Sequence, residues 1–268
     1  MELLLVFSFL LGLALGSFIN MAVYRIDKGE KFFGRSYCDH CHKELALREL
    51  IPVVSYLIYK GKCRSCGKKL SLSYPIVELA SGALSMLSFT LAFPYLADGN
   101  ISVFIFAAII ALSFFEFLLF FAVYDFLFWE LDVLTLKLAL CLGIILNLIS
   151  LIYPLPYLTD PLGNFLAAVT LAGIIYVVVL LTDGSGMGAG DIYLFAFVGL
   201  FTGIDALLIT FTLIVTIGAV FGVIKSLVVR KYQGLLIQFA PFICIGGILS
   251  FILHEQILQL IQSWFLYI

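Results

Sequence analysis

The feature that most constrains this chain is a succession of apolar runs, each about 20 residues long, which is the length of helix that crosses the hydrocarbon core of a bilayer. We count eight such runs, near residues 3–24, 74–96, 101–124, 131–153, 162–182, 191–203, 204–228 and 235–253. Hydrophobic residues make up 63% of the 268 residues and charged residues only 12%. This leaves too little polar surface for a water-soluble protein. The sequence predicts an all-α integral membrane protein with about eight transmembrane helices.

The domain organisation follows from the only long polar segment, residues 25–73, which we call the cysteine loop. We expect a first transmembrane helix over 1–24, a small cytoplasmic zinc-binding domain over 25–73, and a membrane catalytic core of about seven helices over 74–268. Glu2 stands where a signal peptide carries basic residues, so the first helix is expected to stay on the mature protein. Residues 254–268 are expected to form an interfacial amphipathic tail rather than continue the last span.

Positive charge is concentrated in two places and predicts the orientation. Eleven of the fifteen Lys and Arg residues lie between Arg25 and Lys69, and Lys225, Arg230 and Lys231 follow the seventh run. Loops rich in Lys and Arg stay in the cytoplasm, so both segments are expected there. A span count of eight then places the turns near 125–130 and 183–190 on the cytoplasmic side too. The net charge of −2 gives no indication of nucleic-acid binding.

Four cysteines in the cysteine loop form two Cys-x-x-Cys pairs, Cys38 with Cys41 and Cys63 with Cys66, separated by 21 residues. Such pairs at this separation are typical of a tetrahedral zinc site, because each pair offers two thiolates to one ion. Four thiolates close the coordination sphere, which favours a structural zinc over a catalytic one. The adjacent His40 and His42 are expected to be solvated.

Placing a charged acidic residue in or beside a membrane span is energetically unfavourable, so each such residue needs an explanation. Asp191 follows Gly188-Ala189-Gly190, and its structural interpretation is a helix N-cap. Its functional interpretation is a catalytic carboxylate, with Gly188 and Gly190 letting an extended substrate backbone come close. Asp125 ends the third run and could be an ordinary interfacial charge. Two aspartates predicted at one membrane face favour a carboxylate pair that shares a proton and activates water.

Several motifs together resemble the bacterial type IV prepilin peptidases, and the resemblance covers nearly the whole chain. They are Gly16-Ser-Phe-Ile-Asn-Met-Ala-Val-Tyr-Arg-Ile26, the two cysteine pairs, Glu49-Leu-Ile-Pro-Val-Val-Ser-Tyr-Leu57, Ser73-Tyr-Pro-Ile-Val-Glu78, Gly186-Met-Gly-Ala-Gly-Asp191 and Phe239-Ala-Pro-Phe242. The glycine-flanked Asp191 alone would be a weak match, but its place in this ordered series is specific.

The resemblance implies an aspartyl endopeptidase of the bacterial inner membrane, with Asp125 and Asp191 catalytic and the active site at the cytoplasmic face. Its partners would be the lipid bilayer and a prepilin or pseudopilin precursor, whose basic leader peptide is removed. Cysteine-bearing members also methylate the new N-terminus with S-adenosylmethionine, so a second activity is expected. Two departures stand out: Leu131-Asp132 replaces the usual Pro-Asp, which predicts a milder helix kink, and Tyr193 replaces a common Lys.

Three alternatives remain open from the residues themselves. Asp125 and Asp132 are seven residues apart, hence on one helical face, and would form a local pair if one helix carried both. A methyltransferase without peptidase activity would keep the zinc loop and need no aspartate pair. A non-enzymatic transporter or scaffold with a zinc knuckle would explain acids such as Glu116, deep in the third run, as an ion path.

Overall fold

The structure is a computed structural model that describes residues 1–31, 34–184, 187–230 and 237–266. Over these ranges the chain forms helices and no strands. It divides into two compact units, Met1–Val123 and Tyr124–Ile268, and the boundary between them falls inside a helix. The units are described separately.

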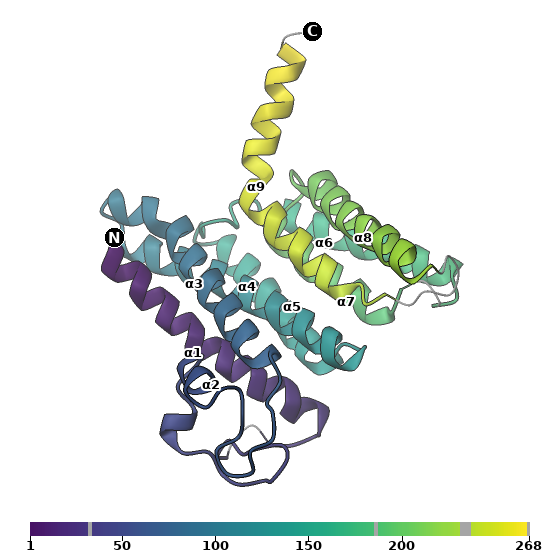
Figure 1. Ribbon diagram of the computed structural model, residues 1–268. Helices are drawn as coiled ribbons and strands as arrows, with labels where there is room; N and C mark the ends of the chain where they lie inside the picture. The colour runs from purple at the N-terminus through teal and green to yellow at the C-terminus, as the bar shows by residue number, and fades with distance from the viewer. Residues whose placement is uncertain (32–33, 185–186, 231–236, 267–268) are drawn as a thin grey trace. The chain divides into compact units, whose positions relative to one another are not determined.

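The element order is simple (Figure 1). The elements are α1 (Glu2–Asp27), the short 3-10 helix η1 (Leu47–Glu49), α2 (Val54–Ile58), α3 (Ser73–Ala97), α4 (Ile101–Phe128), α5 (Val133–Ser150), α6 (Pro161–Leu181), α7 (Ala189–Thr202), α8 (Leu207–Val229) and α9 (Ala240–Leu266).

Eight of these helices are apolar, which confirms the all-α membrane fold. Six are long and apolar enough to cross a membrane, namely α1, α3, α4, α5, α6 and α8. Two more apolar segments, α7 and Ala240–His254 of α9, are shorter. Each matches one run counted in the sequence. The protein is therefore a multi-pass membrane protein, in which helices satisfy their backbone hydrogen bonds internally because lipid offers no partner.

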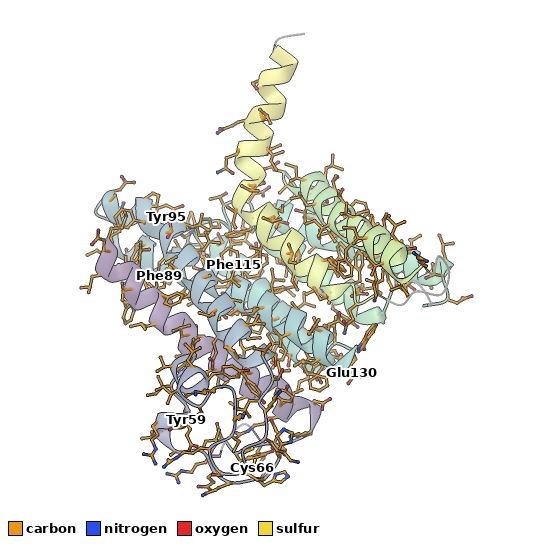
Figure 2. All side chains as sticks on the ribbon, viewed as in Figure 1. Tyr59, Cys66, Phe89, Tyr95, Phe115 and Glu130 are labelled. Atoms are coloured by element: carbon orange, nitrogen blue, oxygen red, sulfur yellow. The ribbon has the colours of Figure 1, made fainter. Side chains whose placement is uncertain are left out.

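Close packing of α1 on α3 builds the first unit. An added Cβ on Gly12 would lie 2.5 Å from the Ser81 carbonyl oxygen, and one on Gly16 would lie 2.6 Å from Glu78 Cα. The two glycines, one helical turn apart, therefore let the α3 backbone approach closely, as small residues do between membrane helices. The cysteine loop connects the two helices, and Figure 2 shows Tyr59 and Cys66 in this loop, away from Phe89 on α3.

Hydroxyl groups of α3 extend this contact. The Ser81 Oγ lies 2.6 Å from the Gly12 carbonyl oxygen and 2.8 and 2.9 Å from the two carboxyl oxygens of Glu116 on α4. Ser85 Oγ donates to the Ser8 carbonyl at 2.8 Å. Glu116 thus joins a hydrogen-bonded contact between helices, which gives this intramembrane acid a packing role and removes the main support for an ion path.

Helix α7 is the centre of the second unit and packs against α5, α6 and α9. A Cβ on Gly199 would lie 2.6 Å from Ala168 Cα, so α6 and α7 are in backbone contact. Asn147 of α5 donates to the Leu200 carbonyl at 3.1 Å and accepts from Asn164 of α6 at 2.8 Å. These buried amides fix the helix that carries Asp191.

The alternative of a local pair of Asp125 with Asp132 is wrong. Asp125 and Asp132 do not share a helix, because α4 ends at Phe128, Trp129 has a φ of +63°, and α5 begins at Val133. Leu131 lies between the two helices, so the chain has a helix end near this position rather than a kink within one helix. Helix α9 continues without a break to Leu266, while its apolar segment ends at His254. The interfacial position expected for residues 254–268 stays a prediction. In Figure 1 the C-terminal half of α9 (yellow) extends away from α6, α7 and α8.

The packing of α1 on α3 can be tested with Gly12→Leu. We expect the variant to lose about 1–3 kcal/mol of stability, because the new side chain overlaps the α3 backbone. Thermal unfolding of the purified protein in detergent measures the change. Gly173→Leu on α6 is the matched control, because a Cβ there has no neighbour within 4 Å. Equal melting temperatures for the two variants would contradict the close contact.

Candidate active site and metal centre

Asp125 lies in the last turn of α4 and is 7% exposed. Its Oδ2 is buried without a hydrogen-bond partner. Burying a carboxyl oxygen without a hydrogen-bond partner is energetically unfavourable. Unsatisfied buried polar atoms are rare in native proteins, and each calls for an explanation such as catalysis or a bound water. The side chain is held from the start of α9, where the Ala240 backbone N–H donates to the carboxyl group.

Asp191 lies in the first turn of α7 and is 8% exposed. The N-cap of this helix is Gly188, three residues earlier, and its N–H donates to Asp191 Oδ2 at 3.0 Å. The expected N-cap position for Asp191 is therefore wrong. The carboxylate instead makes the reciprocal bond of a capping box, which fixes its orientation at the positive end of the helix dipole.

The structure places these two carboxyl groups within electrostatic range of each other. They come from α4 and α7, and they are near enough for the charge of Asp191 to act on Asp125. Both belong to the second unit. Asp132, by contrast, N-caps α5, and its Oδ2 accepts from the N–H and the hydroxyl of Thr135 at 2.7 and 2.6 Å. The local pair of Asp125 with Asp132 is therefore not formed, and Asp132 has a structural role.

Gln238 is a residue of this site that the sequence reading missed. Its Nε2 donates to the carbonyl oxygens of Asp125 and Phe126, the latter at 3.0 Å. The last carbonyls of a helix lack partners within the helix, so this amide caps α4 where it carries Asp125. Gln238 and Ala240 thus hold Asp125 through its backbone and its side chain. A polar residue near the start of the last apolar run, 235–253, was the available signal.

The basic turn expected in the cytoplasm begins at the same end of the second unit. Lys225 Nζ lies 5.8 Å from the centre of the Trp129 ring, which follows α4 directly. This cation–π contact places the end of α8 beside the end of α4. Lys231 and residues 232–234 of that turn, and Gly186 of the glycine-rich turn, lie outside the described residues.

The two glycines before Asp191 have different surroundings. A Cβ on Gly190 would lie 3.1 Å from Leu131 Cβ, so the absence of a side chain at Gly190 leaves space for Leu131. A Cβ on Gly188 would find its nearest neighbour at 3.8 Å, which is an ordinary contact. Only Gly188 therefore presents an open backbone surface beside the aspartates.

The four loop cysteines form a cluster that could hold a metal ion. The Sγ atoms of Cys38, Cys41, Cys63 and Cys66 all lie within 4.8 Å of one another. Thiolates about 2.3 Å from a tetrahedral ion sit slightly less than 4 Å apart, so the cluster fits with a small contraction. Cys38 and Cys63 are buried and the other two are exposed. The remaining cysteines of the chain, Cys141 and Cys244, lie in helices outside this cluster.

The two cysteine pairs have the same local structure. In each, the carbonyl of the first cysteine accepts from the N–H four residues later, of His42 and Gly67, at 2.8 Å. Those residues have positive φ angles, 54° and 70°. Isolated bridges, Tyr37 with Glu44 and Lys62 with Lys69, close the two turns.

The cluster also favours thiolate formation at one position. Burial raises the pKa of the Cys63 thiol, but hydrogen bonds from the backbone of Cys66 and Ser65 and from neighbouring thiols outweigh it and lower the pKa from 9.0 to about 7. Thiolates are the form of cysteine that binds metal ions.

Fold and site together define a class: a multi-pass membrane protein with a buried aspartate pair and a four-cysteine loop. Residues 10–92 match the family model described as the bacterial peptidase A24 N-terminal domain, and residues 112–223 match the type IV leader peptidase family. The chain belongs to the type IV leader peptidase family. No solved structure matches it significantly.

Curated relatives match over nearly their whole lengths. The chain is similar to a prepilin leader peptidase/N-methyltransferase of Bacillus subtilis, with 34% identity over 94% of this chain and 95% of the relative. Proteins of the same name in Dichelobacter nodosus and Pseudomonas aeruginosa are 32% and 31% identical, over 94% and 93% of this chain and 92% and 90% of those proteins.

The shared geometry of the two turns gives a prediction for Gly67→Val. A Cβ on Gly67 has no neighbour within 4 Å, so the cost is purely that of a left-handed backbone for a β-branched residue, about 1–2 kcal/mol. Because loop folding and metal binding are coupled, the metal affinity should fall by about tenfold in a chelator competition. His42→Gly at the equivalent position is the control and should bind at least as well. Unchanged affinity for Gly67→Val would show that the turn is not required.

Proposed function

We propose that this protein removes the basic leader peptide from prepilin or pseudopilin precursors, with Asp125 and Asp191 as the catalytic pair, and then N-methylates the new N-terminus. The observation that carries the peptidase is the meeting of two buried carboxyl groups from separate helices, one of them with an unpartnered oxygen. Membership of the family and the names of its relatives support the same activities.

The chemistry needs a shared proton. Two carboxyl groups held close together cannot both ionise easily, so one keeps its proton while the other is a carboxylate. The carboxylate takes a proton from water as the oxygen attacks the scissile carbonyl carbon, and the protonated partner donates to the carbonyl oxygen. The proton then passes to the leaving amine as the peptide bond breaks. Gln238 and Ala240 are positioning residues, since they fix Asp125 without touching substrate.

The orientation of the substrate follows from charge and hydropathy. The apolar N-terminal helix of a precursor would lie in lipid beside the second unit, with its basic leader in the cytoplasm. The contact of Lys225 with Trp129 supports a cytoplasmic position for the aspartates, because it brings a basic turn to their end of the unit. In bacteria the membrane with a cytoplasmic face is the inner membrane, so we propose that the protein lies there.

We propose zinc as the ion of the cysteine cluster. Four thiolates within 4.8 Å of one another suit zinc, and together they leave no position for a catalytic water. Two of the thiols are exposed, which provides a path of entry. The ion would stabilise a loop whose described residues form two short helices of their own, η1 and α2.

The assignment of the aspartates is tested by Asp125→Asn and Asp191→Asn. Each removes one member of the acid–base pair, and we expect cleavage of a synthetic precursor to fall by about 100-fold or more. Mass analysis of the peptide reports loss of the leader, and Asp132→Asn is the control, expected to retain cleavage if α5 still folds. Normal cleavage by either aspartate variant would refute the mechanism. Continued methylation of a precleaved peptide by the Asn variants would show that the second activity is separate.

The open surface at Gly188 gives a second test. Gly188 has a φ of −77°, which alanine adopts readily, and the added Cβ meets no close neighbour. Gly188→Ala should fold normally yet lower kcat/KM for cleavage by roughly 10- to 100-fold, because the Cβ displaces a substrate backbone that must come close. Gly173→Ala serves as the matched control. Wild-type kinetics for Gly188→Ala would mean that substrate does not approach this glycine.

A further inference from the structure

The two short helices of the cysteine loop lie in an apolar part of this otherwise polar segment. We call residues 47–59, which include η1 and α2, the η1–α2 segment. From Leu50 to Tyr59 it carries no charged side chain. An uncharged run of this length is too short to cross a bilayer and is typical of a buried helix or of a segment in the membrane interface.

The larger aliphatic side chains of the η1–α2 segment are not buried in the protein. Leu57 and Ile58 are 68% and 65% exposed, and Leu47 is 86% exposed. Ile51 and Val54 are about half exposed. Single exposed apolar residues are ordinary, whereas a group of them usually marks a contact with a protein or a membrane. The segment is therefore not a buried helix, and its apolar side needs a neighbour.

The protein-facing side of the segment is already occupied by other side chains. Ser55, Tyr56 and Tyr59 line a cavity of about 170 Å³ within the first unit. Asn20 of α1 and Glu78 of α3 line the same cavity. The η1–α2 segment thus has an inward side, which faces α1 and α3, and an outward side formed by its aliphatic residues.

A hydrogen bond to α3 fixes the depth of the segment. The Val53 N–H donates to Glu78 Oε2 at 2.7 Å. Glu78 lies in the second turn of α3, and its Cα is level with Gly16 on α1, because the two backbones are in contact there. Gly16 lies nine residues before Arg25, the first basic residue of the loop, or about 13 Å along α1. A glutamate side chain and one hydrogen bond span less than this distance, so Val53 lies on the membrane side of Arg25.

Lipid is the neighbour available at this depth. The cysteine loop is tethered at both ends to helices long enough to span a membrane, α1 and α3. On α3, Ile76 and Leu79 are exposed on either side of Glu78 in sequence, as expected for side chains of a span that face lipid. Figure 1 shows α2 at the end of the cysteine loop nearest to α1 and α3, in agreement with the bond between Val53 and Glu78.

Basic residues flank the apolar run on both sides. Arg48 precedes it, and Lys60 and Lys62 follow it, all with exposed side chains. Glu49, the acid next to the run, is tied back by the Ala46 N–H, which donates to its Oε2 at 2.9 Å. Cationic side chains beside an apolar surface are typical of interfacial segments, because they reach lipid phosphates while the apolar side chains enter the acyl region.

We propose that the η1–α2 segment is a membrane-interface anchor, whose aliphatic side chains insert into the lipid beside α3 and hold the cysteine loop on the membrane surface. They are Leu47, Ile51, Val54, Leu57 and Ile58. The anchor is independent of the proposed peptidase and methyltransferase activities. Another protein surface, such as a precursor, is the competing neighbour. Lipid is favoured because the bond to Glu78 sets the segment at the depth of a span and because phosphates complement the flanking cations.

Quenching of fluorescence by lipid tests the anchor directly. Trp129→Phe and Trp264→Phe remove the two native tryptophans, and Leu57→Trp then provides a single reporter. The protein is reconstituted in vesicles of phosphatidylethanolamine and phosphatidylglycerol, with or without bromine on the acyl chains near the headgroups. We expect bromine to lower the emission of the Leu57→Trp protein about twofold or more, because the reporter lies in the acyl region. Lys68→Trp, at an exposed position of the second cysteine turn, is the matched control and should keep its emission.

The outcomes distinguish lipid from water and from protein. Strong quenching of Leu57→Trp with little quenching of Lys68→Trp supports the anchor. Equal quenching of the two variants overturns it. A blue-shifted emission of Leu57→Trp without quenching would show that protein covers the segment, which also overturns the lipid assignment. A shift that appears only when a precursor peptide is added would identify the precursor as that protein.

A second measurement needs no substitution and stays decisive if the tryptophan variants fail to fold. A lipid-soluble carbene reagent is activated by light in vesicles that contain the unaltered protein, and the modified peptides are mapped by mass. Residues 47–58 should be labelled about fivefold or more above residues 36–46 of the first cysteine turn, since only the former enter lipid. Equal labelling of the two peptides would refute the anchor.

Discussion

A membrane protein has no water inside the bilayer to satisfy its polar groups, and this constraint gives meaning to the few that lack a partner. Buried amides such as Asn147 and Asn164 are paired, and buried serines of α3 bond to carbonyls of α1. Among the described residues, Asp125 Oδ2 and Asn20 Oδ1 are exceptions. One lies in each unit. Such unpaired atoms are costly, and a substrate or a water molecule that binds to them offsets the cost.

Close helix contacts hold the backbones of both units in place. Gly12 and Gly16 bring α3 against α1, which positions Asn20 and Glu78 on the same cavity. Gly199 brings α7 against α6, and Asn147 bonds to α7 from α5. Dispersion forces between closely packed backbones replace the hydrophobic effect as the source of association in lipid. Side chains on such a scaffold hold their geometry without an extensive hydrogen-bond network of their own.

Much of the fold was predictable because apolar length and charge placement are read directly from the sequence. The eight runs and the convergence of the four cysteines correspond to the structure. The meeting of Asp125 with Asp191 was expected from topology, although their catalytic role stays a proposal. Asp132 was misjudged because a seven-residue spacing says nothing when the helix ends between the two residues. Gln238 and the unsatisfied oxygen of Asn20 depend on contacts between segments far apart in sequence, which no local pattern records.

The two proposed reactions are chemically ordered, whichever way the units are arranged. A peptide nitrogen has its lone pair delocalised into the carbonyl group and is a poor nucleophile, so methylation requires the free amine that cleavage produces. In the proposed scheme, the product of cleavage is therefore the substrate for methylation. Its apolar helix is expected to stay in lipid after the leader leaves, because exposing some 20 apolar residues to water is strongly unfavourable. In that scheme, the precursor need never leave the bilayer between cleavage and methylation.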